Sequence, residues 1–108
     1  MDNVRPASRS VRISDEVLCR VAELAAQDVE GVAELSAKRS FNNLMGKAVT
    51  IENLDGAISV DACITVKADA RAVIVAAAVQ KAIKQSIQDM AGITAVSVHV
   101  TVSGMEEV

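Results

Sequence analysis

Two segments of the chain repeat apolar residues at steps of three and four, the spacing that places them on one side of an α-helix. Residues 15–30 follow Ser14, a residue type that favours the position just before a helix, and residues 71–90 form the second segment. Gly31 and Gly92 come directly after these segments, and glycine suits the left-handed conformation that ends many helices. The pattern therefore predicts two helices, each closed by a glycine with positive φ.

Strict alternation of apolar and polar residues marks the other segments as β-strands. Residues 48–52 and 57–67 are joined by a short segment with an Asp-Gly step, so they are predicted to form a β-hairpin. Residues 32–37 are predicted to form a short strand and residues 95–103 the last strand. One face of each longer strand is apolar, which indicates a sheet with one buried face.

These elements predict an α+β fold with two layers, in which two helices pack on one face of a small, mostly antiparallel sheet. The predicted order of elements is β-α-β-β-β-α-β. We expect a single domain over residues 11–104, a flexible N-terminal tail over residues 1–10 and a C-terminal tail over residues 105–108. A chain of 108 residues is long enough to bury a core without disulfides.

Composition limits the functions that the chain could perform. It has 11 Lys and Arg against 14 Asp and Glu, a net charge of -3, so there is no overall attraction to nucleic acid or to anionic membranes. The only aromatic residue is Phe41, which argues against a platform for stacking bases. Two cysteines, no apolar leader and no apolar segment suited to a membrane span predict a reduced, cytoplasmic protein without a transmembrane segment.

The candidate chemistry begins with His99, the one histidine of the chain. On the outward face of two strands, His99, Cys63 and Asp61 could supply a nucleophilic triad or three zinc ligands. An open sheet face with no glycine-rich oxyanion loop does not exclude water, so a solvated or partner-covered face is the favoured interpretation. We therefore predict no catalytic residue, no metal site and no cofactor.

The segment between the short strand and the hairpin combines apolar residues at helical spacing with flanking cations. These residues are Lys38, Arg39, Phe41, Leu44 and Met45. The apolar residues could cover the protein's own core, or the segment could contact a phosphate-bearing surface or an acidic partner. Both interpretations remain open from the sequence.

The outer side of the second helix is apolar over its first two turns, where Val73, Ile74 and Ala77 lie opposite the core stripe. Farther along, this side carries Lys81 and Lys84. A helix that is apolar on every side is usually covered on every side, here by the chain itself or by another protein. We predict a protein contact anchored by the apolar residues and rimmed by the lysines.

The order of these motifs resembles the alkaline-shock, or envelope stress response, family of Gram-positive bacteria over about residues 11–104. The matching segments include Ile13-Ser14-Asp15-Glu16-Val17-Leu18, Val29-Glu30-Gly31-Val32 and Met90-Ala91-Gly92. A departure is Ala68-Asp69 ahead of the second helix, where the family often has an aromatic-glycine pair. The resemblance implies a small cytosolic protein without established catalysis, linked to the cell envelope and to alkaline or general stress. It also implies self-assembly or a membrane-anchored partner.

The leading hypothesis is thus a non-enzymatic interaction or structural protein that acts through protein contacts, as a homo-oligomer or with a membrane-anchored partner. An alternative is a small α/β module that binds nucleic acid or a regulatory ligand. A salt-sensitive shift with RNA or DNA would favour the alternative, and the charge balance argues against it.

Overall fold

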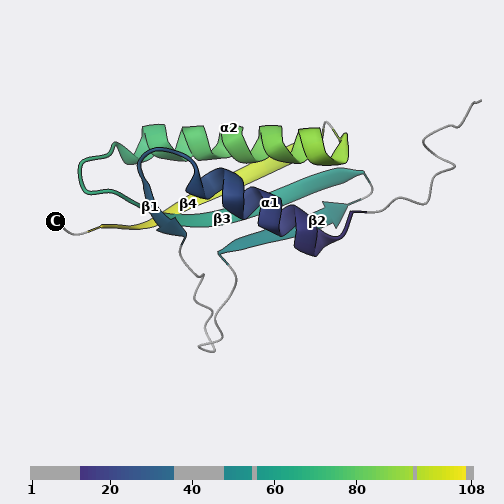
Figure 1. Cartoon of the computed structure of the whole chain (residues 1–108), viewed down its shortest axis with the longest axis horizontal. Helices are drawn as coiled ribbons and strands as arrows, with labels where there is room; N and C mark the ends of the chain where they lie inside the picture. Colours follow the sequence, from purple (N-terminus) through teal and green to yellow (C-terminus); the bar gives the residue numbers. More distant parts are fainter. Residues whose placement is uncertain (1–12, 36–47, 55, 94, 107–108) are drawn as a thin grey trace, which may run out of the picture.

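The computed structural model describes residues 13–35, 48–54, 56–93 and 95–106, which form two helices and four strands (Figure 1). In chain order these are α1 (Asp15–Gln27), β1 (Val32–Leu35), β2 (Val49–Leu54), β3 (Ala57–Val66), α2 (Ala72–Ala91) and β4 (Val96–Met105). The predicted order of elements is confirmed from the first helix onward. The strand predicted ahead of that helix, near Val11, lies outside the described residues.

Strand β3 is the centre of the sheet, because each of the other three strands pairs with it. Strand β4 runs parallel to β3 along one side, from Ile58 to Val66. On the other side, β2 pairs antiparallel with residues 57–62 of β3 and β1 with residues 64–66. The prediction of a mostly antiparallel sheet is confirmed. The parallel neighbours β3 and β4 are joined by α2, the kind of crossover that parallel strands require.

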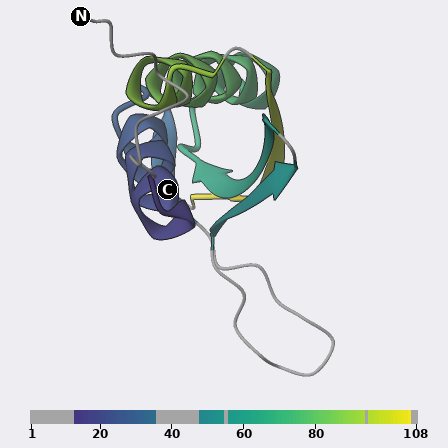
Figure 2. The same ribbon diagram turned by 90° about the vertical axis from the view of Figure 1, so that its right-hand side faces the viewer.

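Both helices lie on the same side of the curved sheet, as the end view in Figure 2 shows. The core between them combines small and branched aliphatic side chains from both helices and all four strands. Its buried members are Leu18, Ala22, Ala26, Val32, Val49, Ile58, Val60, Ala62, Ile64, Val66, Val75, Val79, Ile83, Ile87 and Val96. The face of β3 that the alternation assigned to the core is thus buried throughout. The two-layer α+β fold is confirmed.

Helix α1 begins as predicted and ends earlier than predicted. The Ser14 hydroxyl accepts a hydrogen bond from the Val17 N–H at 3.2 Å, which satisfies one of the free amides at the helix start. The last helical residue is Gln27, so the prediction that the helix reaches residue 30 and is closed by Gly31 is wrong. Gly31 does have the predicted positive φ, 100°, but it lies in the turn that leads into β1.

The reason for the glycine at position 31 is its packing against α2. A Cβ atom there would lie 2.6 Å from Cγ2 of Val75, closer than two such atoms can approach. Gly92 behaves as predicted: α2 ends at Ala91, and Gly92 adopts φ 69° with its N–H donating to the Gln88 carbonyl at 2.8 Å. The hairpin of β2 and β3 is confirmed, and β4 extends to Met105, two residues past its predicted end. Neither helix in the described segments has the length and apolar character needed to cross a membrane.

Candidate protein-interaction surface

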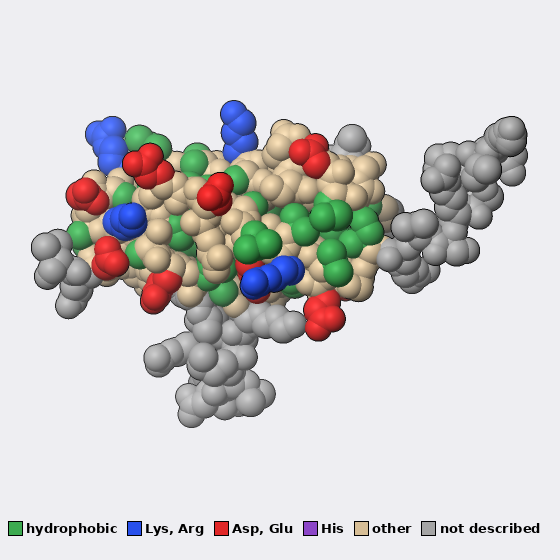
Figure 3. All heavy atoms as spheres, viewed as in Figure 1, with side chains coloured by type: hydrophobic (Ala, Val, Ile, Leu, Met, Phe, Trp, Pro, Cys, Tyr) green, Lys and Arg blue, Asp and Glu red, His purple; other side chains and the backbone are tan. Residues whose placement is uncertain are grey.

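The outer face of α2 exposes large apolar side chains at its start. Val73 is 82% exposed and Ile74 57% exposed, whereas Val75 and Val79 of the same helix are buried in the core. Ala77, Lys81 and Lys84 are also exposed. No other part of the described chain covers Val73 and Ile74. Figure 3 shows apolar side chains at the start of α2 and over α1, with charged side chains between them. The predicted cluster is therefore present as an exposed surface.

The other predicted contact cannot be placed. Lys38, Arg39, Phe41, Leu44 and Met45 all lie within residues 36–47, outside the described residues. Whether this segment covers the core or contacts a partner stays a prediction.

A groove runs between α2 and the first half of β4. Its volume is about 530 Å³, and its lining comes from two elements that are adjacent in space. The lining residues are Ala77, Gln80, Lys81, Lys84, Val96, Ser97, Val98 and His99. The helical residues recur at steps of three and four, so they share one side of α2. Two lysines and a histidine line this groove together with small and β-branched side chains, and its described lining holds no carboxylate.

Gln80 ties the helix to the strand in this groove. Its side-chain Nε2 donates a hydrogen bond to the backbone carbonyl of Val98 at 3.1 Å. Neither Gln80 nor the groove is among the features predicted from the sequence. The spacing of Ala77, Lys81 and Lys84 indicates a shared helix side, but only the position of β4 beside that side creates a groove.

The three residues considered for catalysis are brought near one another without forming a metal centre. Asp61 and His99 are direct neighbours across β3 and β4, and Cys63 is paired with Thr101 one step farther along that face. The Cys63 side chain is buried, at 7% exposure, although the alternation placed it on the outward face. Within the described segments, no group of three His, Cys, Asp or Glu side chains has the arrangement to hold a metal ion.

Replacing His99 by alanine is expected to change the free energy of unfolding by less than about 0.5 kcal/mol, because the side chain is at the surface. We expect no stoichiometric zinc in either the unchanged protein or the variant. Elemental analysis by mass spectrometry after metal-free purification, combined with urea denaturation, measures both quantities. One zinc per chain that is lost in His99→Ala would contradict this prediction.

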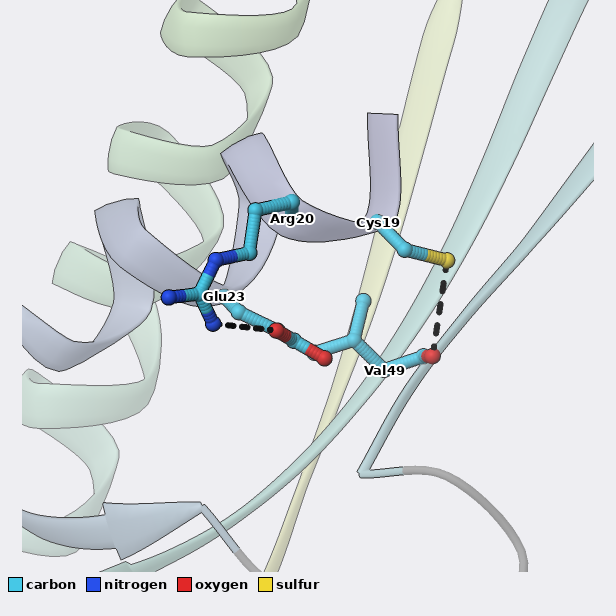
Figure 4. Close-up of polar contacts among 4 residues, drawn as sticks. All are labelled: Cys19, Arg20, Glu23 and Val49. Atoms are coloured by element: carbon cyan, nitrogen blue, oxygen red, sulfur yellow. Dashed lines mark hydrogen bonds and ion pairs between the residues drawn. The ribbon is translucent and has the colours of Figure 1, made fainter. Parts of the chain in front are cut away.

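Figure 4 shows Cys19 together with the nearby ion pair of Arg20 and Glu23. Their contacts do not have the features of a catalytic or metal site. The partly buried Cys19 thiol donates weakly to the Val49 carbonyl, with Sγ and the oxygen 3.7 Å apart, which links α1 to β2. Arg20 and Glu23 form an ion pair at 3.3 Å on the exposed side of α1. A pair of this kind contributes only a few tenths of a kcal/mol, about 0.3–0.5, to helix stability. These contacts are therefore assigned to the structure of α1 and its attachment to the sheet.

Comparison with known proteins gives both a fold and a family. The structure is similar to "MamM CTD - Copper form", with a TM-score of 0.58 and 21% sequence identity over 84% of this chain and 86% of that one. It is also similar to a nickel form of a MamM CTD variant, with a TM-score of 0.52 and 20% identity over 84% and 99% of the two chains. Identities this low show a shared fold alone.

A family model matches nearly the whole sequence. It is that of the alkaline shock protein 23 family, which is described by a cell envelope-related function, and it covers residues 4–107. No curated protein matches the chain. The match includes both helices and all four strands.

Proposed function

The chain belongs to the alkaline shock protein family, whose function is related to the cell envelope, and from this premise we propose that it is a non-enzymatic interaction protein. In this proposal it acts on the cytoplasmic side of the membrane, through contacts with a membrane-anchored partner and with copies of itself. Its task is to connect or organise other proteins during envelope stress.

The observation that carries this proposal is the exposed start of α2. Leaving a branched aliphatic side chain in water forfeits about 25 cal/mol for each Å² of apolar surface, so a folded chain has little reason to display two together unless another molecule covers them. Val73 and Ile74 form such a pair, and they are adjacent in sequence on a well-formed helix.

Lys81 and Lys84 support a protein partner over a nucleic acid. They continue the same exposed side of α2 and fit the polar rim that surrounds the apolar centre of many interfaces. Two lysines on a chain of net charge -3 are too few for strong binding to a polyanion, because such binding depends on neutralising several phosphates.

Charges placed within the apolar cluster test this proposal. The double variant Val73→Glu with Ala77→Lys is expected to reduce capture of the native partner at least about tenfold, since it puts charges at the centre of the contact. Both positions are on the outer side of α2, so the fold should be retained. The measurement is crosslinking and pull-down from native cells, with circular dichroism of the purified variant as the check on folding.

The matched control carries the same two charges on β2, as Thr50→Lys with Asn53→Glu, at positions that are exposed. It should capture the partner as well as the unchanged protein does. Undiminished capture by the folded α2 variant would contradict the proposal. A salt-sensitive mobility shift with RNA or DNA would instead support the nucleic-acid alternative.

A further inference from the structure

Strand β4 has an open edge. Among the described strands β4 pairs with β3 alone, and no described strand lies on its other side. The Ile58 N–H donates to the Ala95 carbonyl at 2.9 Å, so odd-numbered residues at the start of this segment turn their backbone groups toward β3. From Val96 to Val102, even-numbered residues turn theirs outward, and the Val98 carbonyl does so, because it accepts the side chain of Gln80. A register shift between Val102 and Gly104 reverses this pattern, since the Glu106 N–H donates to the Val66 carbonyl at 2.7 Å.

From Val96 to Val102, ahead of the register shift, this edge lacks the features that normally prevent strands from pairing with other chains. Exposed edge strands are usually short, or they carry a charge or a proline. The opposite side of the sheet follows this rule: β1 has 4 residues and contains Glu34, and β2 has 6 residues and contains Glu52. Strand β4 has 10 residues, VSVHVTVSGM, with no Lys, Arg, Asp, Glu or Pro.

We propose that β4 pairs edge to edge with β4 of a second copy of this chain, antiparallel and across a two-fold axis at Val100. The two sheets then form one continuous sheet. Because outward-facing backbone groups belong to even-numbered residues between Val96 and Val102, Val100 faces itself and Val98 faces Val102 of the second copy. The inference rests on the proposed function only in treating the protein as one that acts through contacts.

A second copy suits this edge for three reasons. The outward side chains that would meet are those of His99 and Thr101, so no pair of like-charged acids or lysines opposes another. Two identical open edges satisfy each other in a closed dimer, as two-fold contacts do. The antiparallel arrangement also separates the lysines of the two copies, because Lys81 and Lys84 flank only the first half of β4.

The pairing would also fill space and cover apolar surface that the single chain leaves open. The groove lies beside residues 96–99, and Thr101 and Val102 of the second copy would lie next to His99 and Val98 at this edge. Val98, Val100 and Val102 face the core but are only half-buried, and a continued sheet would bury them further.

Lysines placed on the outward face of β4 test the pairing. In the variant His99→Lys with Thr101→Lys, each lysine would lie opposite a lysine of the second copy. We expect the unchanged protein to sediment as a dimer at micromolar to millimolar concentration. The variant should stay folded, because both positions are on the outward face, and its dimer dissociation constant should rise about tenfold or more.

The control variant Thr50→Lys with Asn53→Lys adds two lysines to β2 and should dimerise like the unchanged protein. A monomeric unchanged protein across this concentration range would overturn the proposal. A folded β4 variant that dimerises as tightly as the control would also overturn it.

A disulfide experiment tests the register. In the proposed dimer, residues 99 and 101 form a non-hydrogen-bonded pair with Cα atoms about 4.5 Å apart, within the range that a disulfide can span. In a background with Cys19→Ser and Cys63→Ala, protein carrying His99→Cys is mixed with protein carrying Thr101→Cys under mild oxidation. We expect the mixture to crosslink more than either variant alone, and an equal yield would overturn the pairing.

These results can be separated from those for the proposed function. The lysine variants on β4 leave Val73 and Ile74 unchanged, so partner capture that survives the loss of the dimer would support both proposals as separate contacts. Loss of capture in the Val73 and Ala77 variant with an intact dimer would support the proposed function independently of the β4 contact. A monomeric unchanged protein that still captures its partner would overturn the β4 pairing alone.

Discussion

Ile83→Ala is expected to lower the free energy of unfolding by about 2–5 kcal/mol, the range found when a large aliphatic side chain is removed from a packed core. Ile83 is completely buried on α2, between Val79 and Ile87, which are also completely buried. The chain has no Trp or Tyr and few large side chains, so little in this core can move to fill the cavity. Equilibrium urea denaturation followed by circular dichroism measures the change.

Val73→Ala on the same helix is the matched control. Its side chain is 82% exposed, so its removal should change the free energy of unfolding by less than about 0.5 kcal/mol. Both variants replace a β-branched residue of the same helix by alanine, so burial is the main difference between them, beside the one additional carbon of isoleucine. Similar effects at positions 73 and 83 would show that the packing of α2 described above is incorrect.

Gly31→Ala is expected to lower the free energy of unfolding by about 2–4 kcal/mol, because two costs act together. Alanine is strained at φ 100°, and its Cβ would lie 2.6 Å from Cγ2 of Val75, a side chain that is itself buried. From sequence alone, the left-handed conformation accounts for only about 1 kcal/mol. The same denaturation experiment measures this variant.

Gly92→Ala separates the two costs. Gly92 has φ 69°, and a Cβ added there would meet no atom of another part of the chain within 4 Å, so alanine should cost only about 1 kcal/mol. Adding Val75→Ala to Gly31→Ala removes the close approach, and the two substitutions together should therefore cost less than the sum of their separate effects. Equal costs at positions 31 and 92, with additive effects of Gly31→Ala and Val75→Ala, would contradict this account.

The local parts of the fold are predictable because the signals for them lie close together in the sequence. The Ser14 cap, the Gly92 end of α2 and the hairpin of β2 and β3 each depend on a few neighbouring residues. The predicted end of α1 is wrong because it rests on Gly31 as a helix terminator. The role of Gly31 depends on Val75, more than forty residues away, and no local pattern reveals that contact.

The candidate site likewise combines features that local sequence predicts with features that depend on distant parts of the chain. The exposure of Val73 and Ile74 follows from helical spacing, because both lie opposite the side that carries Val75 and Val79. The groove and the open edge of β4 could not be predicted, since alternation along a strand does not say which strands become its neighbours. Alternation places Cys63 on the outward face, but it could not show that this part of the face is covered.

The central position of β3 has a consequence for how the chain folds. Every strand pairing in the described chain includes β3, so neither β1 nor β4 can join a sheet before β3 is in place. Its pairing with β2 closes a short turn and costs little chain entropy, whereas β4 must return past a 20-residue helix and β1 must span the segment that precedes β2. The hairpin of β2 and β3 is therefore the natural starting point for folding, and the two more distant strands add to it later. The edge that β4 presents to other chains would then be the last part of the sheet to form, after the hairpin on which it depends.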